Sequence, residues 1–138
     1  LTVGAGGKTL TNSNASGSSL LTVSGGITGT GNVVLNNNST IANGVTVSTG
    51  SVNNVGTVTN SGSGSGNALV SGVIGTNVTG VVENSATSAL TLSGNNIFTG
   101  GATIKAGTLT GSTSANSVHR CRVPGSGSMD LHSPAMAN

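Results

Sequence analysis

Short clusters of Val, Ile and Leu recur along residues 1–118, and Gly, Ser, Asn and Thr separate them. Gly and Asn favour turns because they tolerate positive φ, and Ser and Asn because they hydrogen-bond to nearby backbone. Strand-like clusters at intervals of roughly 8–12 residues, with turn residues between them, indicate an all-β fold. No stretch approaches ~18 consecutive apolar residues, so no transmembrane helix is expected.

The small size of the apolar side chains restricts the core further. Phe98 is the only aromatic residue among 138, and 4% of the residues are charged, against about 25% in ordinary globular domains. A core built on large aromatic side chains is therefore excluded, whereas a narrow core of stacked aliphatic residues is not. Such a core, with small residues at the corners and Thr or Asn outside, is typical of a β-solenoid. Asn and Thr at equivalent places on successive coils are expected to form hydrogen-bonded ladders.

The spacing of the clusters predicts a right-handed parallel β-solenoid of about five coils over residues 1–118. Leu1, Leu21 and Ile41 open three similar segments, which predicts coils of about 20 residues. The predicted strands of the first two thirds of the array cover residues 1–3, 20–23, 32–35, 40–42, 45–48, 55–59, 68–70 and 78–82. Residues 12–19 and 61–67 are the two long turn clusters.

Residues 89–111, ALTLSGNNIFTGGATIKAGTLTG, carry the most specific pattern in the chain. Strand alternation places two leucines on one face of the first strand, and Ile inward and Lys105 outward on the second. Gly107 interrupts that alternation, so a bend or bulge there is expected to return the next leucine to the interior. The expected core residues of this stretch are Leu90, Leu92, Phe98, Ile104 and Leu109.

This stretch resembles the autotransporter-associated β-strand repeat of secreted bacterial surface proteins. That repeat combines an LTLSG strand, an Asn-rich turn, an aromatic residue before TGG and a T-I-x-A-G-T-L strand. With the preceding GVIG strand, the resemblance extends over residues 70–111. It implies a non-catalytic scaffold segment, structural and adhesive, in the passenger region of a protein that is secreted or displayed on the bacterial surface.

The resemblance also implies where partners bind. A stiff stalk would present loops to a host-surface, glycan or matrix ligand, and the two long turn clusters are the candidate contact loops. Their candidate contact residues are Asn12, Asn14, Ser63 and Ser65. The chain starts at Leu1 without an initiator methionine or a signal peptide, so we expect a piece of a longer protein, with any membrane attachment through other parts of it.

Three other functions remain as alternatives. The first is a self-assembling extracellular filament or matrix protein, joined end to end through the strand edges of its terminal coils. The second is a carbohydrate-active β-helix enzyme, and the third is an ice-binding solenoid with a repeating threonine face. The Thr-x-Thr pairs that begin at Thr9, Thr28, Thr57 and Thr108 are unevenly spaced, which disfavours a single such face at a fixed coil length.

The array offers little for catalysis. Its only acid is Glu83, which we expect to be solvated at the end of a strand, and the only other acid in the chain is Asp130. A glycoside hydrolase normally needs two acids near each other. No aspartate precedes residue 130, which excludes a calcium-binding repeat. We therefore expect no catalytic, cofactor or metal site, and a formal charge of +2 is too small to imply nucleic-acid binding.

Residues 119–138 differ from the array in composition. They hold both histidines, both prolines and the only cysteine, and we expect an irregular tail that is either disordered or encoded out of frame. A triad can be written from Ser128, Asp130 and His132, and a metal set from His119, Cys121 and His132. Neither has the spacing of a known catalytic or zinc motif, so we expect no site here.

Overall fold

The structure is a computed structural model that describes the backbone of residues 1–113 and 128–132 and the side chains of residues 1–111. Every regular element in this part of the chain is a β-strand. The described residues thus include no apolar helix long enough to cross a membrane.

Two parallel sheets form the body of the molecule. The five-stranded sheet contains, in spatial order, β11 (Ala102–Ala106), β9 (Val78–Asn84), β7 (Gly56–Asn60), β5 (Val33–Asn37) and β2 (Lys8–Asn12). The six-stranded sheet contains β13 (Ser128–His132), β12 (Thr108–Thr113), β10 (Leu90–Asn96), β8 (Ala68–Val70), β6 (Val45–Val47) and β3 (Leu21–Val23). A narrow third side is formed by β1 (Thr2–Val3), β4 (Thr28–Gly29) and single bridges that join Ile27, Val52 and Ile74.

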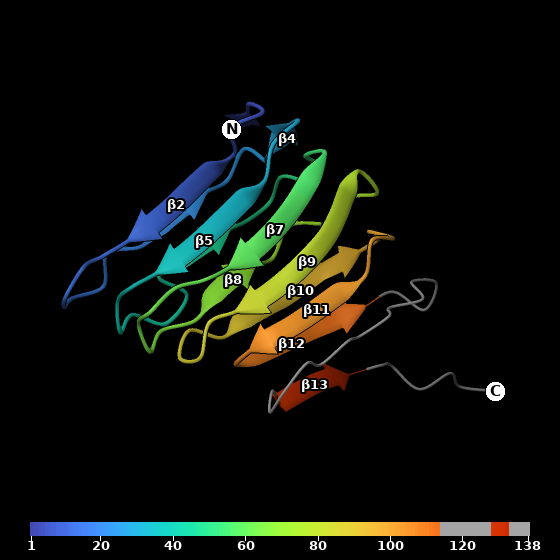
Figure 1. Cartoon of the computed structure of the whole chain (residues 1–138). Helices are drawn as coiled ribbons and strands as arrows, with labels where there is room; N and C mark the ends of the chain where they lie inside the picture. The colour runs from blue at the N-terminus through green and yellow to red at the C-terminus, as the bar shows by residue number, and fades with distance from the viewer. Residues whose placement is uncertain (114–127, 133–138) are drawn as a thin grey trace.

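The chain alternates between the two large sheets and advances by one strand position with each turn (Figure 1). Figure 1 shows that the strands of the two large sheets point in opposite directions across the core and that the chain winds in a right-handed path. The molecule is therefore a right-handed parallel β-solenoid of about five coils, as the sequence predicted.

The coils are longer than predicted, and their length is not constant. Leu21, Val45, Ala68, Leu90 and Leu109 pair in succession, so one coil takes 24, 23, 22 and then 19 residues. The expected period of about 20 residues was wrong because register follows the inward aliphatic side chains, whereas the loops absorb differences in length.

Three strand assignments within residues 1–113 differ from the prediction, and one of them is β4, Thr28–Gly29, which the sequence did not predict. The segment 40–42 lies in the bend and turn between β5 and β6, where no strand forms. Lys8–Asn12, which the sequence did not predict as a strand, forms β2 and pairs with β5 over five residues. Tertiary pairing with β5 fixes this short, Thr-rich segment as a strand.

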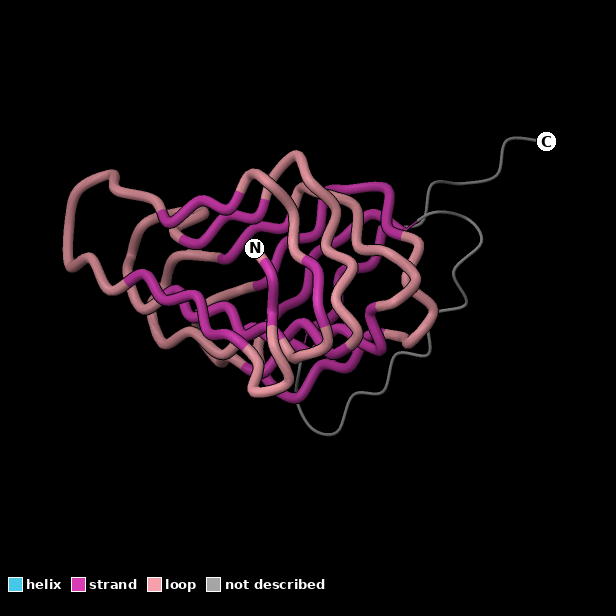
Figure 2. Tube along the Cα trace, turned by 90° about the horizontal axis from the view of Figure 1, so that it is seen from above, coloured by secondary structure: helices cyan, strands magenta, loops and turns pink. Residues whose placement is uncertain are grey.

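The loops that lead from the five-stranded to the six-stranded sheet shorten along the solenoid. They cover residues 13–20, 38–44, 61–67 and 85–89, and the last is Gly107 alone. The loop after β2 extends furthest from the body, at the lower left of Figure 1 and the left of Figure 2. The solenoid is thus widest in its first coils and narrows toward β12.

Gly107 forms the tightest of these corners. Its φ is 75°, in the left-handed region that favours glycine, and it separates β11 from β12. The segment that the sequence suggested as one bent strand is therefore two strands in different sheets. The bend turns Leu109 into the interior, where it is 1% exposed.

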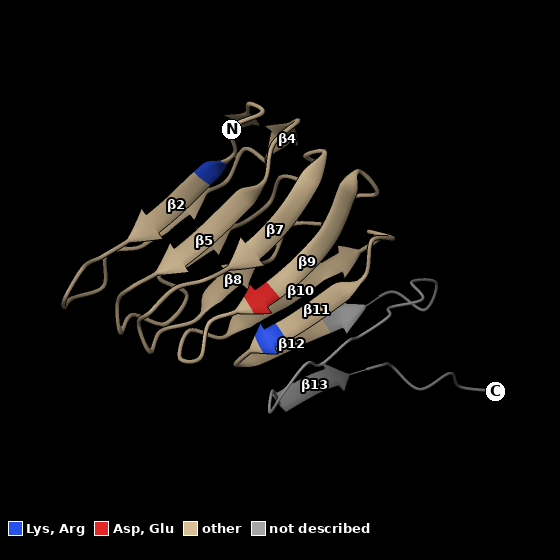
Figure 3. Ribbon diagram, in the orientation of Figure 1, with Lys and Arg blue, Asp and Glu red and all other residues tan. Residues whose placement is uncertain are grey.

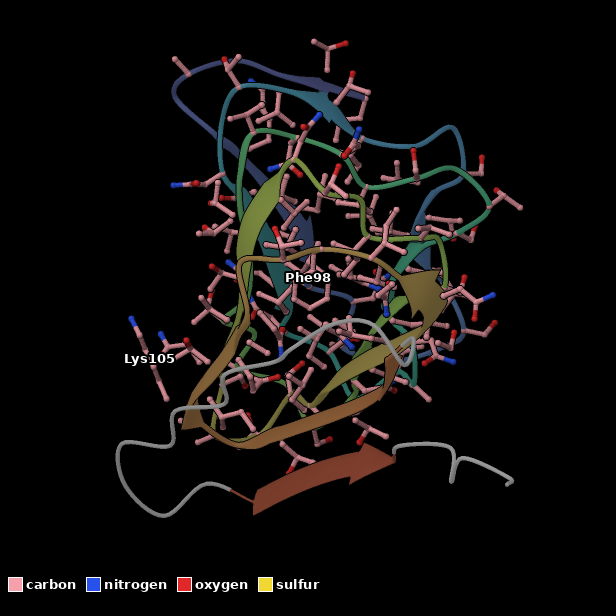
Figure 4. The ribbon with its side chains drawn as sticks, turned by 90° about the vertical axis from the view of Figure 1, so that its right-hand side faces the viewer. Phe98 and Lys105 are labelled. Atoms are coloured by element: carbon pink, nitrogen blue, oxygen red, sulfur yellow. The ribbon has the colours of Figure 1, made fainter. Side chains whose placement is uncertain are left out.

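The core consists of stacked aliphatic residues from all three sides. Leu90, Leu92, Phe98, Ile104 and Leu109 belong to it and are each at most 4% exposed. Figure 4 shows Phe98 pointing into the interior and Lys105 pointing away from the body.

A column of glycines lets the coils approach each other at one corner. Gly50 lies against the backbone of Gly26, Gly72 against Gly50, and Gly94 against Gly72. A Cβ at Gly50, Gly72 or Gly94 would lie closer than 3.0 Å to those backbone atoms, a distance that real Cβ atoms essentially never show. The corner therefore requires glycine for steric reasons.

The expected irregular tail is described only in part. Ser128–His132 form β13, which extends the six-stranded sheet by pairing in parallel with β12. The remaining residues of 119–138, with the candidate ligands His119 and Cys121, lie outside the described residues.

Candidate functional site

Glu83 is the one acidic side chain within residues 1–111, at the end of β9 (Figure 3). We expected it to be solvated, and the structure corrects this: the side chain is 0% exposed. Strand pairing explains the burial. Leu35, Asn60, Glu83 and Ile104 occupy one register column of the five-stranded sheet, and this column faces the core.

The carboxyl group of Glu83 is held by hydrogen bonds from two neighbouring segments. Asn60 Nδ2 donates to Oε1 at 3.1 Å and to Oε2 at 2.9 Å, and the backbone N–H of Ser85 donates to Oε1 at 2.7 Å. Asn60 Nδ2 also donates to the carbonyl oxygen of Ser88. The cluster of Asn60, Glu83, Ser85 and Ser88 thus joins two coils and the loop 85–89.

The serines complete this buried polar cluster. Ser85 Oγ donates to the carbonyl oxygen of Gly62 on the preceding coil and accepts the backbone N–H of Ser88 at 2.7 Å. Ser88 Oγ is buried and has no hydrogen-bond partner among the described residues. The cluster is therefore well connected through Glu83 and Ser85 and incomplete at Ser88.

Burial controls the protonation of Glu83. Removal from water raises the pKa of Glu83 to about 7, from an ordinary 4.5, because it disfavours the charged form. Hydrogen bonds from Asn60 and from the backbone of Ser85, Leu90 and Asn84 oppose the rise and do not cancel it. The carboxyl is consequently protonated in the folded protein under mildly acidic conditions.

The position of Glu83 belongs to a repeated pattern. An asparagine near the end of each earlier strand of the same sheet donates to a carbonyl in the loop of the following coil: Asn12 to Gly44 at 2.7 Å, Asn37 to Asn67 at 3.0 Å, and Asn60 to Ser88. On β9 the corresponding place is taken by Glu83, which, like the asparagines, accepts the backbone N–H two residues further on but has no amide group to donate to the next coil. Aligning VTN at 58–60 with VVE at 81–83 would have revealed this from the sequence.

The buried cluster is poorly suited to catalysis. Its carboxyl is closed off from solvent, and residues 1–111 provide no second acid to act with it. Within the described part of the chain, no group of three His, Cys, Asp or Glu residues is placed to hold a metal ion. Ser128, Asp130 and His132 all lie in β13, whose side chains are outside the described ones.

The predicted contact loops follow β2 and β7 on one edge of the solenoid, in the first and third coils (Figure 1). Asn14, Ser63 and Ser65 are exposed there. Asn12 is not: it is 5% exposed, and its Nδ2 donates to the carbonyl oxygens of Ser19 and Gly44. Our expectation that Asn12 makes external contacts is therefore corrected, because its side chain fixes the base of its own loop.

Hydrogen-bonded ladders connect these loops from coil to coil, as the composition predicted. The backbone N–H and Oγ of Ser63 donate to Asn38 Oδ1 at 2.9 and 3.1 Å. Thr87 Oγ1 in turn donates to the carbonyl oxygen of Ser63 at 3.1 Å. The central loop of the edge is thus tied to the loops on both sides.

A scan against protein-family models and searches of curated proteins and of solved structures found no match for this chain.

Proposed function

We propose that this chain is a non-catalytic structural and adhesive scaffold, part of the passenger region of an autotransporter-like bacterial protein that is secreted or displayed on the cell surface. The solenoid fold and the sequence pattern of residues 70–111 support this proposal. The stacked coils act as the rigid stalk, and the loops at the wide end act as the contact surface.

The observation that carries the proposal is the set of three loops, 13–20, 38–44 and 61–67, on one edge of the first three coils. Asn14, Ser63 and Ser65 present amide and hydroxyl groups to solvent there. Such groups can hydrogen-bond to the hydroxyls of a glycan or matrix ligand. The ladder through Ser63 keeps the central loop ordered, which lowers the entropy cost of binding.

The same features argue against the enzymatic alternative. A carbohydrate-active β-helix enzyme needs acids in an open groove. The single acid of residues 1–111 is Glu83, which is buried. The few charges of the array also provide no basic surface for nucleic acid (Figure 3).

The filament alternative is weakened by Lys8. This residue pairs with the buried Val33 but is itself exposed, because it lies on the outermost strand of the five-stranded sheet. A charged side chain on an edge strand, lysine especially, is one of the devices that prevent edge-to-edge pairing. End-to-end stacking on this edge would have to bury the ammonium group of Lys8 against another core.

Loop deletion tests the adhesive function. Replacing residues 61–67 with a short Gly-Ser turn should abolish binding of the purified chain to an array of immobilised glycans and extracellular-matrix proteins. The flanking strands β7 and β8 keep their own strand partners, so the β-sheet circular dichroism should remain although the hydrogen bonds to Gly62 and Asn67 are lost. The paired substitutions Ser63→Ala and Ser65→Ala should weaken the same binding.

A matched control removes exposed polar groups elsewhere. Thr99→Ala changes an exposed residue on a different side of the solenoid and should leave glycan and matrix binding unchanged. Equal binding by the intact chain and the folded loop-deletion variant would contradict the assignment of the loops as the contact surface.

A further inference from the structure

The outer surface of the six-stranded sheet carries a column of threonines. Thr22 pairs with Thr46, Thr46 with Leu69, Leu69 with Thr91, and Thr91 with Thr110. Each lies between two inward residues of its strand, so its side chain faces outward. All five are partly or fully exposed to solvent. Four of five successive coils thus place a threonine hydroxyl on the same line.

A second column of hydroxyls runs beside the first. It consists of the serines that follow the second inward residue of successive strands: Ser24, Ser48, Ser71 and Ser93. Backbone hydrogen bonds keep the serines of this column in register. Ser48 N–H donates to the Val23 carbonyl oxygen at 2.9 Å, and Ser71 N–H donates to the Val47 carbonyl oxygen at 2.8 Å. Each of these serines is at least partly exposed.

Together the two columns form a two-dimensional array of hydroxyl groups. Neighbouring strands lie about 4.7–4.9 Å apart, and residues two apart in a strand are separated by about 6.6 Å. The change of coil length from 24 to 19 residues does not disturb this array, because the loops take up the difference. The Thr-x-Thr pairs at Thr9, Thr28 and Thr57 lie outside the six-stranded sheet, and of the pair that begins at Thr108 only Thr110 belongs to this array.

The chemistry of this face restricts its partner. The strands β3, β6, β8, β10 and β12 contain no charged and no aromatic residue. The array ends at the register position of Asp130 in β13, beside Thr110. A charged polymer would find no opposite charge here, and a sugar ring would find no aromatic ring on which to stack. The matching partner is uncharged, extended and able to hydrogen-bond at regular intervals.

We propose that this face binds the surface of ice. Ice presents uncharged oxygens that donate and accept hydrogen bonds in a regular two-dimensional array, with repeats similar in size to those of the hydroxyl columns. A threonine hydroxyl both donates and accepts, and β-branching leaves its side chain few rotamers to lose on binding. The hydroxyls are therefore arranged before contact, which reduces the entropy cost of binding.

Two of the threonines are further fixed by neighbouring asparagines. Thr46 Oγ1 donates to the carbonyl oxygen of Asn43 at 2.7 Å, and Thr91 Oγ1 accepts from Asn67 Nδ2 at 3.3 Å. Each hydroxyl keeps free hydrogen-bonding capacity for a partner. Leu69 interrupts the column between them and is the position where the array can be improved.

The outer surface of the five-stranded sheet is a matched control within the same molecule. Its central column alternates Thr and Val, at Thr9, Val34, Thr59, Val82 and Thr103. Lys105 lies on the same sheet and points away from the body (Figure 4). This face therefore has sparser hydroxyls and a charge, and ice should not bind to it.

Ice-affinity partition of the purified chain tests the proposal, together with microscopy of ice recrystallisation. The intact chain should enter the ice fraction and slow recrystallisation. Thr46→Lys should abolish both effects, Thr59→Lys on the opposite sheet should retain them, and Leu69→Thr should increase partition into ice. Thermal unfolding of each variant establishes that it is folded.

Each outcome of these experiments either supports ice binding or overturns it. An intact, folded chain that remains in the liquid fraction overturns the proposal, as does equal loss of activity in Thr46→Lys and Thr59→Lys. Retention on microcrystalline cellulose or chitin without partition into ice would also overturn it and assign the face to a polysaccharide. Should Thr46→Lys fail to fold, Ser71→Lys at an exposed position of the second column replaces it, and Leu69→Thr remains informative.

Discussion

Asn60 lies directly beside Glu83 in one inward column of the solenoid, and its Nδ2 donates to both carboxyl oxygens, at 3.1 and 2.9 Å. The two polar residues occupy the positions between the aliphatic Leu35 and Ile104 in the same column. Buried polar groups are tolerated when they are hydrogen-bonded. Asn60 and Glu83 form these hydrogen bonds with each other, on the two strands β7 and β9, where the loops to the six-stranded sheet shorten from residues 61–67 to residues 85–89.

The first prediction concerns pH. The pKa of Glu83 is about 7 in the folded protein against 4.5 for an unburied glutamate, so between these values the folded state binds more protons than the unfolded state. The free energy of unfolding should therefore fall as pH rises from 4.5 to 7 and then level off. The loss should be about 3 kcal/mol, at about 1.36 kcal/mol per pKa unit. Urea denaturation at pH 5 and pH 8 measures it.

Glu83→Gln identifies the source of this slope. Glutamine keeps a carbonyl oxygen that can accept from Asn60 and from Ser85 N–H, and it does not ionise. The variant should lose most of the difference between pH 5 and pH 8, whereas Lys105→Gln at an exposed position should keep it. The same pH slope in Glu83→Gln and the unsubstituted chain would show that another group causes it.

The sequence was sufficient for the fold class because solenoid packing depends on features visible in it. Short aliphatic clusters, turn residues and the near absence of aromatics all restrict the chain to thin stacked coils. Local alternation predicts the strand Ala102–Ala106 correctly, whereas the Asn-rich turn expected after the LTLSG strand lies within β10, Leu90–Asn96. The length of a coil could not be predicted from the sequence, because the inward side chains set the strand register and the loops can vary in length.

The burial of Glu83 could not be predicted from alternation alone. A charged residue at a strand end is ordinarily solvated, and only a comparison between coils, which pairs Glu83 with Asn60, places this one inside. The hydroxyl array on the six-stranded sheet could not be predicted from the sequence for a related reason. Its members, such as Thr22 and Thr46, share no fixed sequence spacing and become neighbours only through register.

The glycine column predicts a steric penalty. Gly72→Ala would place a Cβ closer than 3.0 Å to the carbonyl oxygen of Gly50, so the coils must separate locally. Overpacking of this kind costs about 1–3 kcal/mol. Gly4→Ala is the control, because nothing lies within 4 Å of a Cβ there. Equal urea midpoints for the two variants would contradict the close approach of the coils at Gly72.

Phe98 should dominate packing at its end of the core. It is the only aromatic residue and is 1% exposed, so Phe98→Ala removes a large buried side chain and leaves a cavity. Such substitutions cost about 3–5 kcal/mol. The adjacent Ile97 is 49% exposed, and Ile97→Ala should change stability by no more than about 0.5 kcal/mol. Denaturation of both variants under one condition gives the comparison, and similar losses would argue against the inward placement of Phe98.

The asparagine ladder should contribute stability across coils. Asn67 Nδ2 donates to Asn43 Oδ1 at 2.6 Å and to Thr91 Oγ1 at 3.3 Å, and its Oδ1 accepts from the Asn43 backbone N–H at 2.9 Å. Asn67→Ala leaves these partly buried partners unsatisfied and should cost about 1–3 kcal/mol.

Asn67→Asp keeps the oxygen that accepts from Asn43 N–H and loses the amide donor. Its loss of stability therefore shows whether the accepted or the donated hydrogen bonds contribute more. Asn14→Ala, at an exposed loop position, should be neutral in the same urea titration. A neutral Asn67→Ala would mean that water replaces the ladder without loss and that stacking of the coils depends on the aliphatic core and backbone alone.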